Sequence, residues 1–214
     1  MAGRQRFGKL KDHATKTFKF DQTKLINQAD EMRVNLELLM RGIDTDKWSG
    51  YSSTIGACSI FAGIWLADRL RGRMEMKAYM ALTDNRQKLV VKSIGANAEL
   101  KETADSLSNA LLVRKLNLQV GMPSILKDLS DVKSERRSQY FFVACEGTNR
   151  SNAKITHAVA YSHRGGGTFF DPNAGEYINV AAKAFMFFQE WDSAYNQDVF
   201  NHAQYDTFIC YPVA

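Results

Sequence analysis

One stretch of the chain decides how it folds, and it reads Ser53-Thr54-Ile55-Gly56-Ala57-Cys58-Ser59-Ile60-Phe61-Ala62-Gly63-Ile64-Trp65. From position 57 onward, apolar residues recur every three or four positions until Asp68 and Arg69 close the run. This spacing predicts a helix with one buried face, running to about Leu70 and preceded by a loop of small residues. Cys58 therefore stands where a loop becomes a helix.

That position matters for the chemistry of a thiol. The start of a helix presents unpaired backbone N–H groups and the positive end of the helix dipole. Both lower the pKa of a cysteine and favour the nucleophilic thiolate, so Cys58 is a candidate nucleophile. The alternative for an isolated cysteine is the ordinary one, a small buried hydrophobic residue. The rest of the chain has to decide between the two.

The composition limits the class of protein. The chain has 214 residues, 45% of them hydrophobic and 24% charged, a balance typical of a globular domain with its own core. It has no run of 18 apolar residues that would cross a membrane, and its N-terminus lacks the apolar segment of a Sec signal peptide. Three cysteines without CxxC spacing and four histidines without a metal motif predict neither a disulfide framework nor a metal site.

The net charge of +5 is concentrated at the N-terminus. Residues 1–24 contain two acidic residues, Asp12 and Asp21, against the basic residues Arg4, Arg6, Lys9, Lys11, Lys16, Lys19 and Lys24. We expect residues 1–24 to form a flexible basic arm that can make weak contacts with an anionic membrane or a nucleic acid. Residues 25–214 are expected to form a single domain.

Helical and strand patterns occupy different halves of the chain. Helical periodicity covers residues 25–43, 58–70, 74–93 and 97–116, and residues 121–139 are expected to form a helix or loop linker. Aromatic and β-branched runs predict strands at 140–145, 155–161, 168–171 and 206–211, with an amphipathic helix over 178–195. The predicted fold class is α+β, with an N-terminal helical part that carries the Cys58 helix packed on a C-terminal antiparallel sheet.

Two polar residues of the predicted sheet could complete a site with Cys58. Strand alternation puts His157 on the same face as Val159 and Tyr161, and Asp171 ends the next strand, after a glycine-rich turn. Pairing of these strands would bring Asp171 to the same end of the sheet as His157. Taken singly, His157 could be a hydrogen-bonded core histidine, and Asp171 could be part of a turn. The order Cys, His, Asp, however, is that of papain-like thiol enzymes.

The sequence also resembles a known family. The relevant segments are Gly-Ala-Cys-Ser at 56–59 with Trp65 on the following helix, Ile-Thr-His-Ala-Val-Ala at 155–160, and Phe-Phe-Asp-Pro-Asn-Ala-Gly-Glu at 169–176. Together they look like the YopT/AvrPphB-type cysteine peptidases, over roughly residues 50–211. The segment at 169–176 is the most specific of the three.

The resemblance implies a papain-like fold and a Cys-His-Asp triad. Cys58 matches the nucleophile, His157 the general base and acid, and Asp171 the orienting carboxylate. Proteins of this family are bacterial effectors, so the resemblance implies a thiol protease that acts in virulence, as an effector or toxin, on a protein substrate in a target cell. It further implies a bacterial cytoplasmic protein secreted by a specialised system rather than by Sec, with no cofactor and no metal.

The oxyanion donor departs from the family's pattern. Papain-like enzymes place an amide side chain five or six residues before the nucleophile, and here those positions hold Ser53 and Ser52. We expect one of these hydroxyls to act with the Cys58 backbone N–H as the oxyanion site. The alternatives left open are deamidase, transglutaminase or amidase chemistry by the same triad, and a non-catalytic binding module.

Overall fold

The computed structural model describes residues 7–21, 58–72, 118–197 and 203–214. Their elements, in chain order, are η2 (Gly8–Asp12), β1 (Thr15–Phe18), α4 (Cys58–Leu70), β2 (Ser124–Leu126), η3 (Leu129–Ser134), β3 (Tyr140–Asn149), β4 (Lys154–Ser162), β5 (Thr168–Asp171), β6 (Gly175–Ile178), η4 (Val180–Lys183), α8 (Ala184–Asn196) and β7 (Ala203–Val213). The strands form one seven-stranded sheet in the order β1-β6-β5-β4-β3-β7-β2. Every pairing in it is antiparallel, so the α+β class is confirmed.

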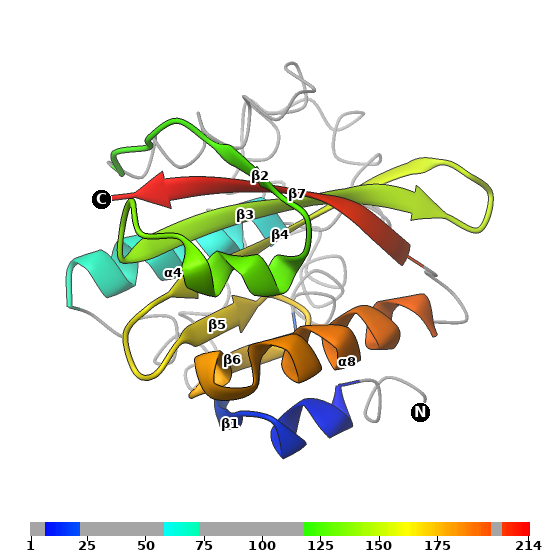
Figure 1. The fold of residues 1–214 in the computed structure, drawn as a ribbon, viewed down its shortest axis with the longest axis horizontal. Helices are drawn as coiled ribbons and strands as arrows, with labels where there is room; N and C mark the ends of the chain where they lie inside the picture. The colour runs from blue at the N-terminus through cyan, green and yellow to red at the C-terminus, as the bar shows by residue number, and fades with distance from the viewer. Residues whose placement is uncertain (1–6, 22–57, 73–117, 198–202) are drawn as a thin grey trace, which may run out of the picture.

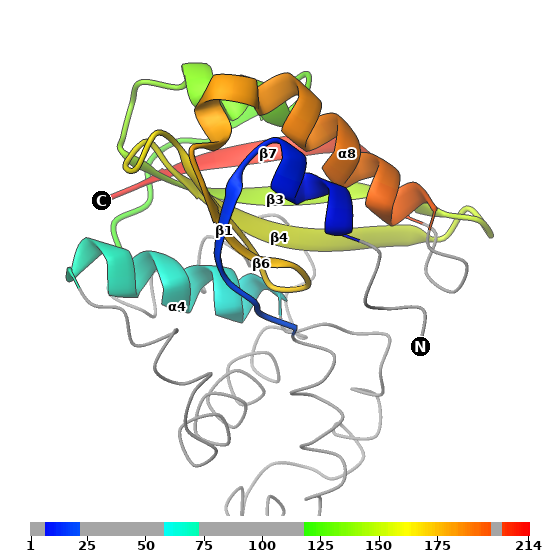
Figure 2. The same cartoon turned by 90° about the horizontal axis from the view of Figure 1, so that it is seen from below.

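Helices cover both faces of this sheet (Figure 1). Helix α4 packs against β3, β4 and β5, and α8 lies over the opposite face, as the two views together show (Figure 2). Successive residues of β5 illustrate the arrangement, because a strand directs its side chains alternately to its two faces. Phe170 stacks on Trp65 of α4, whereas Phe169 packs against Phe187 of α8. The central strands are therefore buried on both faces, which explains their continuous apolar and aromatic sequence.

The N-terminal segment differs from the expected flexible arm over its described part. Residues 15–18 form β1, an edge strand that pairs with β6. Leu10 is 1% exposed, and Phe20, which is fully buried, contacts Phe61 and Phe170. Charge patterning missed this because three of the four lysines around β1 and η2, Lys9, Lys11 and Lys19, are exposed, while apolar residues between them enter the core.

Two further strands were not expected from the sequence. Residues 121–139, predicted as a helix or loop linker, contain the short edge strand β2 and the 3-10 helix η3. Residues 175–178 form β6, which pairs with both β5 and β1. Neither β2 nor β6 contains two adjacent aromatic residues, the feature that marked the equally short β5. The predicted helices over 25–43, 74–93 and 97–116 lie outside the described residues.

Gly175 allows the β5–β6 hairpin to lie against the N-terminal segment. Its φ is +110°, and a Cβ built on it would lie 2.2 Å from the carbonyl oxygen of Phe18 and 2.9 Å from the backbone nitrogen of Phe20. Any larger residue would meet backbone rather than a movable side chain. A glycine is therefore required where this strand begins.

We predict that Gly175→Ala destabilises the protein. Backbone strain at this φ costs about 1–3 kcal/mol, and the overlap with the backbone of Phe18 adds to it. Gly8→Ala is a matched control, since a Cβ at Gly8 meets no atom within 4 Å, and it should change stability by less than about 0.5 kcal/mol. Denaturant unfolding of the three proteins measures both effects, and equal stabilities would contradict the argument.

Candidate active site

Cys58 is the first residue of α4. Its side chain is a free thiol and only 8% exposed. The residues before it, which include Ser52 and Ser53, lie outside the described part of the chain, so the oxyanion donors proposed from the sequence stay a prediction. The apolar face of the helix that starts here packs on the sheet through Phe61 and Trp65, both nearly fully buried.

His157 lies on β4, the central strand that the sequence predicted. Its side chain is 4% exposed and is surrounded by aromatic rings. The ring centroids of Trp191 and Tyr205 lie 6.3 and 6.1 Å from that of the imidazole in nearly parallel planes, and the ring of Tyr195 lies 5.3 Å away. Such packing fixes the plane of the imidazole and removes it from water. Its protonation therefore depends on its polar partners.

Asp171 supplies the main partner. It is the last residue of β5, and the register places it diagonally across from His157, as the predicted hairpin required. The distance from His157 Nε2 to Asp171 Oδ1 is 3.0 Å. Asp171 is fully buried, so its charge has to be satisfied inside the protein.

The Asp171 carboxylate accepts further hydrogen bonds besides that of His157. The backbone N–H of Asn173 donates to Oδ1 at 2.7 Å, and Trp191 Nε1–H donates to Oδ2 at 2.6 Å. The hydroxyl of Tyr195 donates to Oδ2 at 2.9 Å. A carboxylate has about four lone-pair positions, and these donors together with His157 occupy them. The site is thus built to hold an ionised aspartate.

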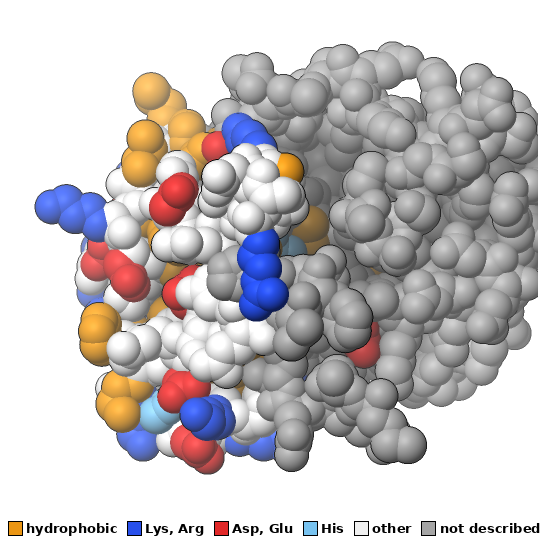
Figure 3. All heavy atoms as spheres, turned by 90° about the vertical axis from the view of Figure 1, so that its right-hand side faces the viewer, with side chains coloured by type: hydrophobic (Ala, Val, Ile, Leu, Met, Phe, Trp, Pro, Cys, Tyr) orange, Lys and Arg blue, Asp and Glu red, His pale blue; other side chains and the backbone are white. Residues whose placement is uncertain are grey.

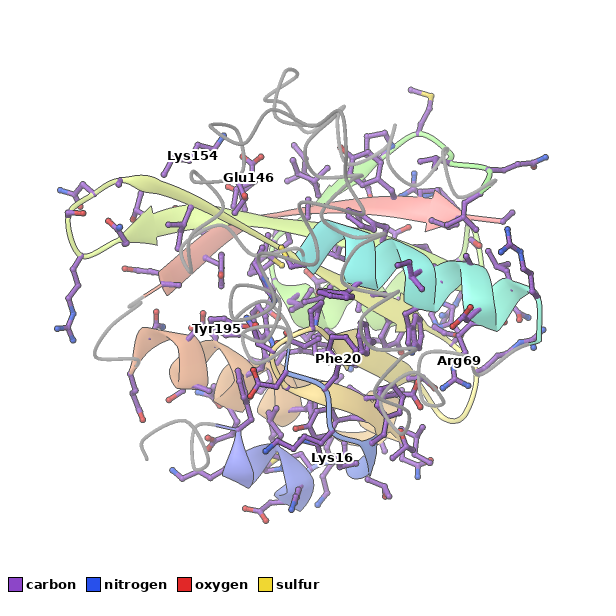
Figure 4. The ribbon with its side chains drawn as sticks, turned by 180° about the vertical axis from the view of Figure 1, so that it is seen from behind. Lys16, Phe20, Arg69, Glu146, Lys154 and Tyr195 are labelled. Atoms are coloured by element: carbon purple, nitrogen blue, oxygen red, sulfur yellow. The ribbon has the colours of Figure 1, made fainter. Side chains whose placement is uncertain are left out.

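Tyr195 links the two members of this pair. Its hydroxyl oxygen lies 3.0 Å from His157 Nε2, and it accepts a hydrogen bond from Asn173 Nδ2 at 2.8 Å. Figure 4 shows Tyr195 on α8, next to the sheet. Asn173 therefore acts on the pair through its backbone N–H and through Tyr195.

Tyr195 and Trp191 are the residues of the candidate site that sequence reasoning missed. Apolar residues on this helix recur with helical spacing, which is typical of core packing. The available signal was that the two residues are four positions apart, so two aromatic side chains with polar tips share one helix face. Buried tyrosine and tryptophan side chains usually direct their polar atoms to a partner.

The protonation of His157 follows from these neighbours. Burial alone lowers the pKa of His157, but the charge and the hydrogen bond of Asp171 raise it, and hydrogen bonding and charge from the Cys58 side chain raise it further, to about 10. For Asp171, burial raises the pKa, but the charge and hydrogen bonds of its partners lower it overall from its ordinary value of 3.8. The structure thus brings Cys58, His157 and Asp171 together, with His157 protonated and Asp171 ionised at neutral pH.

The open edge of β4 explains how a helix on one face reaches a histidine on the other. Strand β5 pairs with β4 only from Ala160 to Ser162, whereas β4 continues back to Lys154. Among the described strands, none covers this side of β4 at His157. The Cys58 side chain, at the start of α4, forms a hydrogen bond with the imidazole.

The other two cysteines have a different environment. Cys145, opposite His157 on β3, and Cys210 on β7 are both fully buried. Burial raises the pKa of the Cys145 thiol well above its ordinary value and that of Cys210 to about 12. Both therefore remain neutral thiols at neutral pH, in keeping with the core positions expected from the sequence.

The described residues include neither a metal-binding group nor a membrane-spanning helix. They contain no group of three or more histidine, cysteine, aspartate or glutamate side chains placed to hold a metal ion. None of the described helices is long and apolar enough to cross a membrane. The surface seen in Figure 3 carries acidic and basic side chains interspersed over its described half.

The two pKa shifts predict how stability depends on pH. The raised pKa of His157 gives a contribution that is complete below its ordinary value of 6.5 and is lost as pH rises towards 10. The lowered pKa of Asp171 gives a contribution that is present above 3.8 and is lost as pH falls through its folded value. The pair therefore stabilises the fold most between pH 3.8 and 6.5.

We predict that Asp171→Asn lowers the pKa of His157, because burial remains while the neighbouring negative charge is gone. NMR titration of the imidazole measures this directly. In denaturant unfolding, the wild type should lose stability between pH 6.5 and 10, and the variant should lose less over the same interval. A variant whose His157 is still protonated at pH 8 would contradict the assignment of Asp171 as the dominant partner.

Comparison with known proteins bears on the fold. No protein family model matches this sequence, and no curated protein sequence matches it. Among solved structures, the chain is similar to the crystal structure of the Pseudomonas avirulence protein AvrPphB, with a TM-score of 0.55 and 15% sequence identity. The match covers 74% of this chain and 91% of that one. At 15% identity the likeness concerns the fold alone. This chain shares with AvrPphB the overall fold described above, an antiparallel sheet with helices packed against it.

Proposed function

We propose that this protein is a cysteine peptidase with Cys58, His157 and Asp171 as its triad. The observation that carries the proposal is the buried hydrogen bond between His157 and Asp171, with the imidazole also meeting the thiol at the start of a helix. The fold likeness to AvrPphB supports it, since the resemblance in the sequence points to the family named after that protein.

The geometry suggests how the roles divide. Nε2 of His157 is engaged by Asp171 and Tyr195, so Nδ1 is the nitrogen left to face Cys58. An imidazolium in this position stabilises the thiolate, which attacks the carbonyl carbon of a peptide bond. Asp171 fixes the ring orientation and stabilises its positive charge.

The proton returns during the reaction. As the tetrahedral intermediate collapses, His157 gives its proton to the leaving amine and becomes neutral. It then removes a proton from the water that attacks the thioester, and the acid product leaves with Cys58 restored as thiolate. The Cys58 backbone N–H, with Ser52 or Ser53, is the proposed donor set for the oxyanion.

The proposed context is that of an effector acting on a protein in a target cell. The support is the family resemblance of the sequence together with a fold like that of a Pseudomonas avirulence protein. Delivery by a specialised secretion system, from the bacterial cytoplasm, belongs to the same proposal.

Alkylation of the three cysteines tests the triad without a known substrate. Iodoacetamide labelling followed by mass spectrometry should show Cys58 reacting far faster than Cys145 and Cys210, which serve as internal controls because they are buried and neutral. The Cys58 rate should reach its plateau well below the ordinary thiol pKa of about 8.5. His157→Ala should abolish this reactivity at low pH. A Cys58 that titrates as an ordinary thiol, unaffected by His157→Ala, would overturn the proposal.

Tyr195→Phe should shift the acid limb of the Cys58 alkylation profile to higher pH. The variant keeps the aromatic ring but removes a hydrogen bond to Asp171, and losing a donor raises the pKa of a carboxyl group. Tyr161→Phe is the matched control, because the Tyr161 hydroxyl is buried without a hydrogen-bond partner among the described residues. If the two variants gave the same profile, Tyr195 would have no part in holding the pair.

A further inference from the structure

A second buried carboxylate lies outside the proposed triad. Glu176, on β6, is 1% exposed. A buried carboxylate is costly unless it is paired and hydrogen-bonded. Its partners should therefore show what it does.

The partners of Glu176 come from two other elements. Thr17 Oγ1, on β1, donates to Oε1 at 2.7 Å. Oε2 accepts a hydrogen bond from Trp65 Nε1 at 2.6 Å and forms an ion pair with Arg69, both on α4. Figure 4 shows Arg69 at the C-terminal end of α4, on the side of the β5–β6 hairpin. One carboxylate thus joins the helix to the hairpin and to the edge strand.

The contacts around Glu176 fix the helix in more than one direction. Glu176 is the cross-strand partner of Phe170, and the Trp65 ring stacks on Phe170 with an interplanar angle of 3° and a centroid distance of 5.7 Å. The guanidinium of Arg69 lies 5.3 Å from the centroid of the Trp65 ring. Stacking limits how close the helix comes to the sheet, while the hydrogen bond and ion pair limit its rotation and sliding.

The position of Cys58 follows from this attachment. Trp65 and Arg69 follow Cys58 by seven and eleven residues, so the three lie along one stripe of the helix. At a rise of about 1.5 Å per residue, Trp65 is about 10 Å from Cys58 along the axis. A rotation or slide of α4 at Trp65 would move the thiol with it. The same hairpin carries Asp171, so one hairpin positions both the thiol and the carboxylate.

We propose that Glu176 is a positioning residue, which sets the Cys58 helix in register with the hairpin that carries Asp171 and so places the thiol against His157. The inference rests on the proposed function. Whether or not the thiol is catalytic, the Glu176 side chain holds α4 to the sheet.

Glu176→Gln is the principal test, with Thr17→Val as matched control. The glutamine keeps the shape but loses the charge that Arg69 pairs with, and a misplacement of about 1 Å can lower reactivity about 10²-fold. We expect the rate of Cys58 alkylation at pH 6 to fall at least about tenfold, with a changed pH profile. Thr17→Val removes only the bond from β1, so that rate should change by less than about twofold.

Two further variants keep β6 intact in case Glu176→Gln does not fold. Trp65→Phe retains an aromatic ring on Phe170 but loses the N–H bond, and Arg69→Met loses the ion pair. Each should lower the Cys58 rate at pH 6 in a protein whose circular dichroism is unchanged. The double variant Arg69→Met/Glu176→Gln should lose little more than Glu176→Gln alone, because both changes break the same ion pair.

Hydrogen exchange of the α4 backbone separates this proposal from the proposed function. Glu176→Gln should speed exchange in residues 59–70 and leave α8 unchanged, whether or not the wild-type thiol is catalytic. Folded variants with wild-type exchange in α4 and a wild-type Cys58 pH profile would overturn the positioning role. If wild-type Cys58 has no His157-dependent reactivity while α4 exchange still responds, the proposed function fails and the attachment of α4 by Glu176 is supported.

Discussion

The interaction on which the site depends is the ion pair of His157 and Asp171 inside the protein. A carboxylate with no exposure to water is tolerated only because other groups donate to it, and these come from the turn after β5 and from α8 as well as from β4. The imidazole is in turn held between aromatic rings. The strand pairing, the turn and the position of α8 all have to be correct for this one pair to be stable.

The β5–β6 hairpin carries two buried carboxylates, and each needs partners from other elements. Asp171, at its turn, pairs with the histidine beneath α8, and Glu176, on its second strand, receives the side chains of α4. On the first strand of the hairpin, Phe169 packs against α8 and Phe170 packs against α4. The hairpin therefore contacts the helices on both faces of the sheet. Gly175 leaves room for the N-terminal segment to lie against the hairpin.

Part of this could be predicted from the sequence. The strand carrying His157, the strand ending at Asp171 and the helix beginning at Cys58 follow from local periodicity, and hairpin pairing alone places Asp171 beside His157. The strands β1, β2 and β6 were not predicted, because none of them contains two adjacent aromatic residues, as the equally short β5 does. Their existence depends on partners distant in the chain.

By itself, then, the sequence determined which residues are candidates for the chemistry and on which kinds of element they lie, because side-chain type and hydrophobic period are local properties. Only the tertiary structure decided how those residues are supported. The hydroxyl of Tyr195 reaches Asp171 from 24 positions away, and the indole of Trp65 reaches Glu176 from 111 positions away. Contacts of this kind are set by how helices and strands pack, since a polar side chain in the core takes whichever partner the packing brings within hydrogen-bonding distance.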